Sequence, residues 1–390
     1  MRLVFSTEDF VFAGRPRPGF PLVLDNDMKP AEPLHGYLLH RLLEKGKRLD
    51  IKTWEAYGRR LWDFAQFLNA NNYEWNQPFV STAHSVVRNY RDWQAEDLKL
   101  SPATINDRLE IVADLYNWAL ERRMIERLPF EYEDVTVRGI EHDFSHLTGG
   151  QRSFRRPDIL VNEWEQEPAF LMADQLRLAR ASTRSTSHRI AFDLMARVGL
   201  RSIETCTFPE FYVFDPFTRT DIKPGSLIDV ALDPRDMGIK FGRPRVVHVP
   251  FSLMAEMNTY KVFERNAFVR PERDRKELLL TTHGNRFAKE SLCKVIGDLG
   301  RKVGFAIRPL MLRHSYAIHT LLLLREHPEM KIEPLMYVRD RLGHSSVQTT
   351  MVYLRQIERL LGAEALTMMN EFDALYGVTS AWSAGNRVLN

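Results

Sequence analysis

Cysteine is almost absent from this chain of 390 residues, which contains only Cys206 and Cys293. Two thiols cannot form a disulfide framework, and neither cysteine lies in a C-x-x-C or Cys/His spacing that would bind a metal. Long apolar runs are also missing, because no stretch approaches the roughly twenty apolar residues that a membrane-spanning helix needs. The first residues, which include Glu8 and Asp9, lack the apolar segment of a secretory signal. We therefore expect a cytoplasmic protein with packed thiols and no membrane partner.

The sequence has little excess charge of either sign. Its net charge is only +3, so the overall balance does not by itself indicate a nucleic-acid partner. Hydrophobic residues make up 44% and charged residues 27%, which is typical of folded globular domains. Short basic clusters lie at Arg59–Arg60, Arg122–Arg123, Arg152 with Arg155–Arg156, and Arg339 with Arg341. Each of them, taken alone, is more often a solvated surface than a phosphate-binding site.

Common enzyme motifs are missing as well. The sequence contains no G-x-G-x-x-G, no G-x-x-x-x-G-K-[ST], no H-E-x-x-H and no G-x-S-x-G. These motifs bind dinucleotides, cradle nucleotide phosphates, hold catalytic zinc and present a nucleophilic serine, respectively. Their absence removes support for nucleotide hydrolysis and for zinc hydrolysis.

The length allows two domains, each with its own core. Residues 1–30 mix apolar residues, glycine and proline without a helical period, which predicts an N-terminal arm or extension. A helical period dominates residues 31–130, where Ser101 and Pro102 predict the cap and first turn of a helix. Two apolar stripes run through this part: Tyr57, Leu61, Phe64 and Leu68, then Ile105, Leu109, Val112, Tyr116 and Ala119. We interpret both as the core of a helical domain.

Residues 131–170 have little periodicity, and we interpret them as an interdomain linker whose arginines could neutralise DNA phosphates. Helical patterns resume over 171–181 and 187–200. Two β-branched runs within 226–250 flank a turn-rich segment, which predicts a small antiparallel sheet. The predicted fold is therefore mostly α with a small antiparallel sheet. A mixed α+β domain covers residues 171–362, and a C-terminal helix and tail cover 363–390.

Cationic and hydroxyl residues follow one another in the second half of the chain. The segments are Gly199-Leu200-Arg201-Ser202-Ile203-Glu204, Leu312-Arg313-His314, Arg341-Leu342-Gly343-His344 and, nine residues after His344, Tyr353. Ser345 is the predicted cap of the helix that carries the tyrosine. Each segment is weak evidence alone, because an Arg/Glu pair is usually a structural ion pair, and Tyr353 could simply be a packed aromatic. His314 is expected to form a structural hydrogen bond.

The ordered series, with Lys240 on the turn of the predicted sheet, resembles the tyrosine recombinase or phage integrase family. Segments 53–57 and 101–106 are similar to the family's helical core-binding domain, and 240–250 looks like its catalytic hairpin. The resemblance implies a site-specific recombinase that breaks and rejoins double-stranded DNA through a 3′-phosphotyrosyl link, without cofactor or metal. It implies a homo-tetramer on DNA, or an assembly with related recombinases, at the nucleoid. The implied catalytic residues are Arg201, Lys240, Arg313, His344 and Tyr353, with Glu204 supporting the arginines.

The chemistry of phosphodiester cleavage accounts for this set of residues. Guanidinium groups such as Arg201 and Arg313 can clamp the doubly charged transition state. A tyrosine hydroxyl is a poor nucleophile at neutral pH, so nearby cations are expected to favour the phenolate of Tyr353. Lys240 is the candidate acid for the departing 5′ oxygen, and by resemblance His344 hydrogen-bonds the phosphate.

One position departs from the family pattern. The family usually has histidine or lysine three residues before its second arginine, and here that residue is Leu310. Leucine can neither relay a proton nor contact phosphate, so Arg308 or His314 substitutes for it, or the enzyme works with one contributor fewer, or it is impaired. Two alternatives therefore remain: a DNA-binding regulator of the same fold that lacks catalysis, and a type IB topoisomerase.

Overall fold

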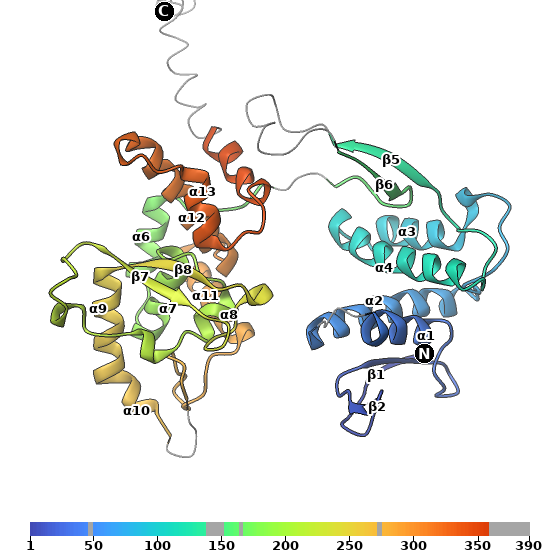
Figure 1. Ribbon diagram of the computed structural model, residues 1–390, viewed down its shortest axis with the longest axis horizontal. Helices are drawn as coiled ribbons and strands as arrows, with labels where there is room; N and C mark the ends of the chain where they lie inside the picture. Colours follow the sequence, from blue (N-terminus) through green and yellow to red (C-terminus); the bar gives the residue numbers. More distant parts are fainter. Residues whose placement is uncertain (46–49, 138–151, 164–166, 271–274, 359–390) are drawn as a thin grey trace, which may run out of the picture. The chain divides into compact units, whose positions relative to one another are not determined.

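The computed structural model describes residues 1–45, 50–137, 152–163, 167–270 and 275–358. The chain divides into two compact units, Met1–Glu165 and Gln166–Asn390 (Figure 1). Each unit has its own hydrophobic core. The C-terminal helix and tail predicted for 363–390 lie outside the described residues.

The first unit begins with short strands. β1 (Arg2–Phe5) pairs antiparallel with β4 (Pro21–Leu24), and β2 (Val11–Phe12) pairs with β3 (Arg15–Pro16). Phe20 and Val23 are completely buried in the core of the unit, and the Phe20 ring lies edge-on to Trp54 of the next helical region, with ring centres 6.2 Å apart. The first thirty residues therefore pack against the helices of this unit.

Four helices form most of the first unit: α1 (Leu34–Leu39), which continues as a wider helical turn over His40–Glu44, α2 (Ile51–Ala70), α3 (Val86–Glu96) and α4 (Pro102–Glu121). The predicted cap is confirmed, because the Ser101 hydroxyl accepts a hydrogen bond from the Thr104 backbone N–H and Pro102 occupies the first turn. The two predicted stripes are confirmed as core. Their residues Leu61, Phe64, Leu109 and Val112 are completely buried.

Residues 131–170 contain a strand pair that the sequence pattern did not reveal. β5 (Tyr132–Val137) pairs antiparallel with β6 (Arg152–Pro157). The sequence of β6, RSFRRP, lacks the alternation of apolar and polar residues that marks a half-buried strand. The division between the units falls after Glu165, within the interval that we interpreted as a linker, and the role of that interval as a linker stays a prediction.

The second unit is mostly helical around one two-stranded sheet. β7 (Leu227–Leu232) and β8 (Arg245–Pro250) pair antiparallel, which confirms the predicted sheet. The helices are α6 (Ala173–Ala181), α7 (Thr186–Ala196), α8 (Ser202–Cys206), α9 (Phe251–Thr259), α10 (Asn266–Phe268), α11 (Lys289–Val303), α12 (Pro309–Glu326) and α13 (Pro334–Leu342). A further helical segment covers 348–358. Its start differs from the prediction, because the hydroxyl that accepts the Gln348 N–H is that of Ser346 and not Ser345.

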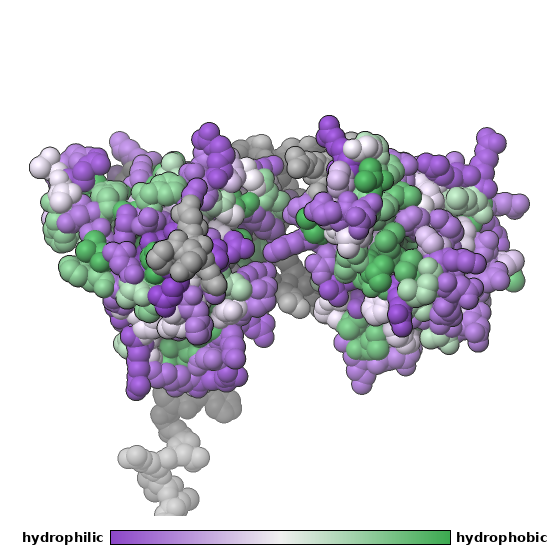
Figure 2. Space-filling view, turned by 90° about the horizontal axis from the view of Figure 1, so that it is seen from below, coloured by the Kyte–Doolittle hydropathy of each residue, from purple (hydrophilic) through white to green (hydrophobic). Residues whose placement is uncertain are grey.

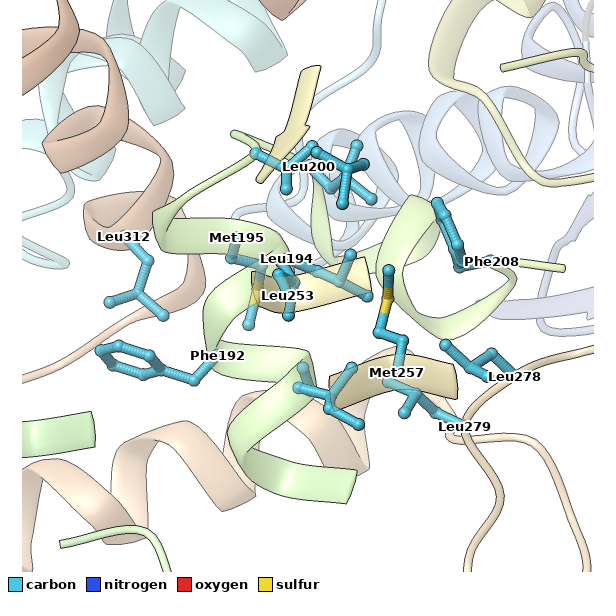
Figure 3. Close-up of a cluster of buried hydrophobic side chains, with 14 of the residues drawn as sticks. Phe192, Leu194, Met195, Leu200, Phe208, Leu253, Met257, Leu278, Leu279 and Leu312 are labelled. Atoms are coloured by element: carbon cyan, nitrogen blue, oxygen red, sulfur yellow. The ribbon is translucent and has the colours of Figure 1, made fainter. Parts of the chain in front are cut away.

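The core of the second unit fixes the backbone on which the candidate site stands. Leu200 and Leu312 are completely buried in it (Figure 3). Each of these leucines directly precedes one of the two candidate arginines, Arg201 and Arg313. Burying a leucine side chain contributes about 1.5–3 kcal/mol, so the core energy holds the two arginine positions in place.

Gly199 is the glycine with the strongest steric requirement near this region. It has φ +77°, and a Cβ atom there would lie 2.5 Å from Cδ1 of Tyr316. We expect Gly199→Ala to destabilise the protein by about 3 kcal/mol, because a left-handed backbone and an overpacked ring both oppose the methyl group.

Gly225→Ala is the matched control for this substitution. Gly225 has φ +84° and nothing within 4 Å of the added Cβ, so only the backbone term of about 1 kcal/mol applies. Urea unfolding of the two variants measures the difference, and equal losses would contradict the steric argument at Gly199.

The outer surface is predominantly polar. Figure 2 shows hydrophilic residues over most of the visible face of each unit, with smaller hydrophobic areas between them. Among the described residues, none of the helices combines the length and the apolar character that crossing a membrane requires.

Candidate active site

A buried carboxylate lies at the centre of the candidate site. Glu204, on α8, has no solvent exposure, and both of its oxygens accept hydrogen bonds from Arg245, at 3.0 and 2.6 Å. Arg201 Nη1 lies 3.2 Å from the same carboxylate, and Arg313 Nη1 lies 3.9 Å from it. Three guanidinium groups therefore share one carboxylate. This imbalance leaves a net positive charge that an incoming anion can neutralise.

The carboxylate stays ionised in this surrounding. Burial acts to raise the pKa of Glu204, but the hydrogen bonds and charge of Arg245, the N–H of Arg201 and the charge of Arg313 outweigh it. The pKa therefore lies below its ordinary value. A charged Glu204 is required, because a neutral one would leave three buried or half-buried cations facing each other.

Arg313 is held by backbone carbonyls as well as by charge. Its guanidinium donates to the carbonyl oxygens of Gly199 and Leu342. Burial, followed by repulsion from Arg201, lowers the pKa of Arg313 to about 9, which still leaves it protonated at neutral pH. The arginine thus ties α12 to the residue before Leu200 and to the end of α13, so three separate segments meet at one side chain.

Tyr353 lies next to this cluster on the helical segment 348–358. Its side chain is almost completely buried, with 3% exposed, and its hydroxyl lies 2.8 Å from Nδ1 of His314. Burial raises the pKa of Tyr353 above its ordinary value, while Arg313 and Arg201 act in the opposite direction. The two arginines therefore act towards the phenolate, as expected, but burial outweighs them. The hydroxyl keeps its proton at neutral pH.

His344 completes the cluster on the other side of the tyrosine. It follows Gly343, the left-handed residue that ends α13, and its ring stacks on that of Tyr353 with centres 6.4 Å apart. Its Nδ1 lies 3.0 Å from the Thr350 hydroxyl. Burial, then the charges of Arg313 and other nearby groups, lowers the pKa of His344 to about 3. The imidazole is therefore neutral and can offer one N–H to a phosphate oxygen.

Lys240 stands apart from these residues. It lies on the exposed turn between β7 and β8, where its ammonium nitrogen is 4.8 Å from the centre of the Phe241 ring. In the part of the chain that the structure describes, no hydrogen bond or ion pair joins Lys240 to the arginine cluster. Five of the six predicted site residues are therefore brought together, and Lys240 is the exception.

Leu310 is 60% exposed on the first turn of α12. Of the two groups named as substitutes for it, Arg308 is exposed and borders a cavity of about 830 Å³ together with Leu310. The other group, His314, contacts the Tyr353 hydroxyl. The structure thus gives this histidine a direct contact with the candidate nucleophile, beyond the structural hydrogen bond that we expected of it.

Arg245 is a further residue that the sequence argument did not place in the site. It is at the start of β8, and its Nε also donates to the carbonyl oxygen of Arg341. The available signal was the period of the strand, since Arg245 has the same parity as the buried residues Val247 and Val249. That parity indicates a side chain directed into the unit.

The part of the chain that the structure describes contains no group of three or more His, Cys, Asp or Glu residues that could hold a metal ion.

Comparison with known proteins finds relatives that are named tyrosine recombinases. No family model matches the chain. The tyrosine recombinase XerA of Pyrococcus furiosus is 29% identical over 144 residues, which are 36% of this chain and 44% of the relative, so the chain aligns with less than half of that relative's length. The tyrosine recombinase XerC of Roseiflexus castenholzii is 28% identical over 327 residues, 83% of this chain and 88% of the relative. Both relatives that this chain resembles are named tyrosine recombinases.

Solved structures confirm the predicted fold. The XerH site-specific recombinase bound to a palindromic difH substrate, in a post-cleavage complex, has a TM-score of 0.55 and 15% identity, covering 84% of this chain and 83% of that one. The Tn1549 transposon integrase in complex with transposon right-end DNA has a TM-score of 0.54 and 13% identity, covering 84% and 98%. The predicted fold class, mostly α with a small antiparallel sheet, is thereby confirmed.

The two half-buried histidines of the candidate site, His314 and His344, predict a loss of stability in acid. Burial, then the charge of Arg313, lowers the pKa of His314 to about 4, and that of His344 is about 3. Both values lie below the ordinary 6.5, so the unfolded chain binds these protons first as the pH falls below 6.5. We expect the free energy of unfolding to decrease between pH 6.5 and about 4, by on the order of 1 kcal/mol for each histidine after allowance for partial exposure.

Urea unfolding of the wild type and of His344→Gln at pH 7 and pH 5 measures this contribution. The variant should lose less stability than the wild type between the two pH values. His283→Gln, at an exposed histidine, is the control and should behave like the wild type. An equal loss in the wild type and His344→Gln would count against a neutral, buried imidazole.

Proposed function

We propose that this chain is a site-specific DNA recombinase that cuts and rejoins double-stranded DNA through a covalent 3′-phosphotyrosyl intermediate at Tyr353. The observation that carries the proposal is that a buried tyrosine lies within the electrostatic influence of Arg313 and Arg201, which share one carboxylate with Arg245. The net positive charge of such a cluster can be neutralised by one phosphodiester anion. The relatives named above are recombinases, which supports the same reaction here.

Arg201 is the arginine best suited to meet the phosphate. Its side chain is 20% exposed, whereas those of Arg245 and Arg313 are 6% and 3% exposed. We assign Arg201 to direct contact with the non-bridging oxygens, and Arg313 to stabilising the charge that grows on them. Glu204 and Arg245 position these two, and His344 donates to a phosphate oxygen through its neutral imidazole.

Lys240 is assigned to the leaving group. Transfer of the phosphoryl group to Tyr353 breaks the bond to the 5′ oxygen, which leaves as an alkoxide unless it receives a proton. Lys240 is exposed on the segment that joins β7 to β8. Arg245, the first residue of β8, is fixed to Glu204 by hydrogen bonds. In this assignment the lysine approaches the 5′ oxygen when DNA is bound. The phosphotyrosyl link preserves the ester, so rejoining requires no cofactor.

Full strand exchange joins two DNA duplexes, and we propose that it takes four protomers, or an assembly with related recombinases, acting on DNA at the nucleoid. Sedimentation of the protein with and without its cognate duplex measures the number of protomers.

A catalytically inactive DNA-binding regulator is the second candidate function. The exposed Leu310 and the raised pKa of Tyr353 favour it, because both reduce the reactivity of the tyrosine. The two functions differ in one product, which is the covalent adduct.

The deciding experiment traps that adduct from a mixture of possible target sites. Purified protein is incubated with a pool of duplexes of randomised sequence, each nicked so that cleavage releases a short strand and cannot be reversed. Complexes that survive detergent are collected, digested with trypsin and analysed by mass spectrometry, and the attached DNA is sequenced. A nucleotide on the peptide that contains Tyr353, together with an enriched sequence, supports the recombinase. Reversible binding without an adduct across the whole pool would leave only the regulator.

A further inference from the structure

The proposed reaction needs an acceptor for the tyrosine proton. Leu310 cannot serve, because leucine has no lone pair and its side chain is exposed. Lys240 and the arginines act as donors in the proposed reaction, so none of them is the acceptor. We propose that His314 is the catalytic base that removes the proton from the Tyr353 hydroxyl as that oxygen attacks the scissile phosphate. This inference rests on the proposed function.

The contact between the two side chains has the geometry that a proton transfer requires. His314 Nδ1 lies 2.8 Å from the Tyr353 hydroxyl, and the ring centres are 5.5 Å apart. This distance is within the 2.6–3.2 Å in which a general base works. His314 is on α12, one turn beyond Leu310 and next to Arg313. The base therefore comes from the same helix as the missing family residue, but from a position inside the cluster.

The charges around His314 keep it in the accepting form. The charged and titratable groups that act on it are Arg313 from its own helix, His344 after α13 and Tyr353 from the segment 348–358. Burial and the positive charge of Arg313 both oppose protonation, so the imidazole is neutral before DNA binds. A phosphodiester anion placed among the arginines offsets part of that positive charge and makes His314 a stronger base when the substrate is present.

The step balances with the groups already named. His314 starts with its proton on Nε2 and a lone pair on Nδ1. The Tyr353 oxygen forms a bond to phosphorus, its proton passes to Nδ1, and the bond from phosphorus to the 5′ oxygen breaks with transfer of a proton from Lys240. His314 ends as an imidazolium and Lys240 as a neutral amine. Rejoining reverses each transfer, so both groups are restored when the strand is sealed.

A structural role is the alternative for the same contact, since a histidine can simply hold the tyrosine ring in place. Glutamine separates the two roles. The His314→Gln side chain can still hydrogen-bond the Tyr353 hydroxyl, but it cannot take up its proton. A structural contact would tolerate this change, and a base would not.

The experiment uses the nicked duplex recovered from the randomised pool and measures the rate of adduct formation in a single turnover. We expect His314→Gln to be slower than the wild type by about 10²–10⁴-fold, the range for loss of one acid–base group. The rate of the variant should rise with pH up to alkaline values, because hydroxide must then form the phenolate, while the wild-type rate reaches a plateau. His314→Ala should be partly rescued by added imidazole. His248→Gln is the matched control, because His248 Nδ1 makes the same kind of bond to the Tyr337 hydroxyl, and its rate should equal that of the wild type.

A duplex with sulfur in place of the bridging 5′ oxygen separates the base from the acid. A thiolate leaves without a proton, so this substrate should restore Lys240→Ala and leave His314→Gln slow. Thermal unfolding and circular dichroism establish that each variant is folded. If His314→Gln is unfolded, imidazole rescue of His314→Ala and the wild-type plateau decide the question.

The outcomes distinguish this inference from the function on which it rests. A wild-type rate with a wild-type pH profile in His314→Gln, no response of His314→Ala to imidazole, or full restoration of His314→Gln by the sulfur substrate would overturn the role of His314 alone. Failure of the wild type to form any adduct overturns the proposed function and this inference together.

Discussion

Tyr353→Phe is expected to abolish the covalent protein–DNA adduct on the nicked duplex, with the yield falling below detection. In the proposed reaction the phenolic oxygen is the atom that bonds to phosphorus, and no hydroxyl remains at that place in the variant. Binding of the duplex should persist, because the phenylalanine ring fills the same buried space beside His344. The measurement is the fraction of labelled duplex that stays with the protein in detergent, beside a gel-shift measurement of reversible binding.

The stability of Tyr353→Phe should change little. The substitution removes one hydrogen bond, to His314, which is worth about 0.5–1.5 kcal/mol. Tyr260→Phe is the control: Tyr260 is another fully buried tyrosine of this unit, and its hydroxyl accepts a hydrogen bond from the Leu280 backbone N–H. It should retain full adduct formation. An adduct of normal yield in Tyr353→Phe would show that another residue is the nucleophile.

Glu204→Ala is expected to have the largest effect on stability, a loss of about 3–5 kcal/mol in the free energy of unfolding. The change removes the only carboxylate described as shared by Arg201, Arg245 and Arg313. It leaves their charges uncompensated in a buried place. Glu204→Gln should lose less, because the amide oxygen can still accept a hydrogen bond. Urea unfolding at neutral pH measures both losses.

An exposed ion pair provides the control for Glu204. Asp221 and Arg219 lie 2.9 Å apart with both side chains more than half exposed, so Asp221→Ala should leave stability nearly unchanged. A similarly small loss for Glu204→Ala would contradict the view that this carboxylate holds the cluster together.

The pH dependence of the Glu204 contribution follows from the direction of its shift. The folded pKa lies below the ordinary value of 4.5. The stabilisation is therefore fully present above that value and is lost as the pH falls through the lower, folded pKa. The difference in stability between the wild type and Glu204→Gln should be constant from pH 7 to pH 5 and should decrease only in stronger acid.

Short sequence motifs were sufficient to predict most residues of the candidate site. Arg201 and Arg313 each follow a leucine that is buried in the core. One short motif therefore contains both the buried leucine and the candidate arginine. His344 follows a glycine that ends a helix, which is also a local signal. These residues could be predicted because the physical reason for their position lies within a few residues of them.

The missed residues depend on contacts between distant segments. Arg245 meets Glu204 across 41 positions of sequence, and His314 meets Tyr353 across 39. The helical period indicates on which face of α12 His314 lies. It cannot show that the segment 348–358 packs on that face. Lys240 presents the opposite case, since its motif identifies a turn, and the structure leaves that turn exposed and apart from the cluster. The catalytic role that the family resemblance implies for Lys240 stays a prediction.

The separation of the two hydrophobic cores has a consequence for how such a chain can change over generations. No described residue belongs to both cores, and the arginines, histidines and tyrosine of the cluster all come from the second unit. A substitution that weakens one core therefore leaves the packing of the other intact, as expected for sites that share no partners. All residues of the cluster follow the division after Glu165, so a replacement of the chain before that point keeps every one of them. We therefore expect a lineage to vary the sequence of the two units at different rates.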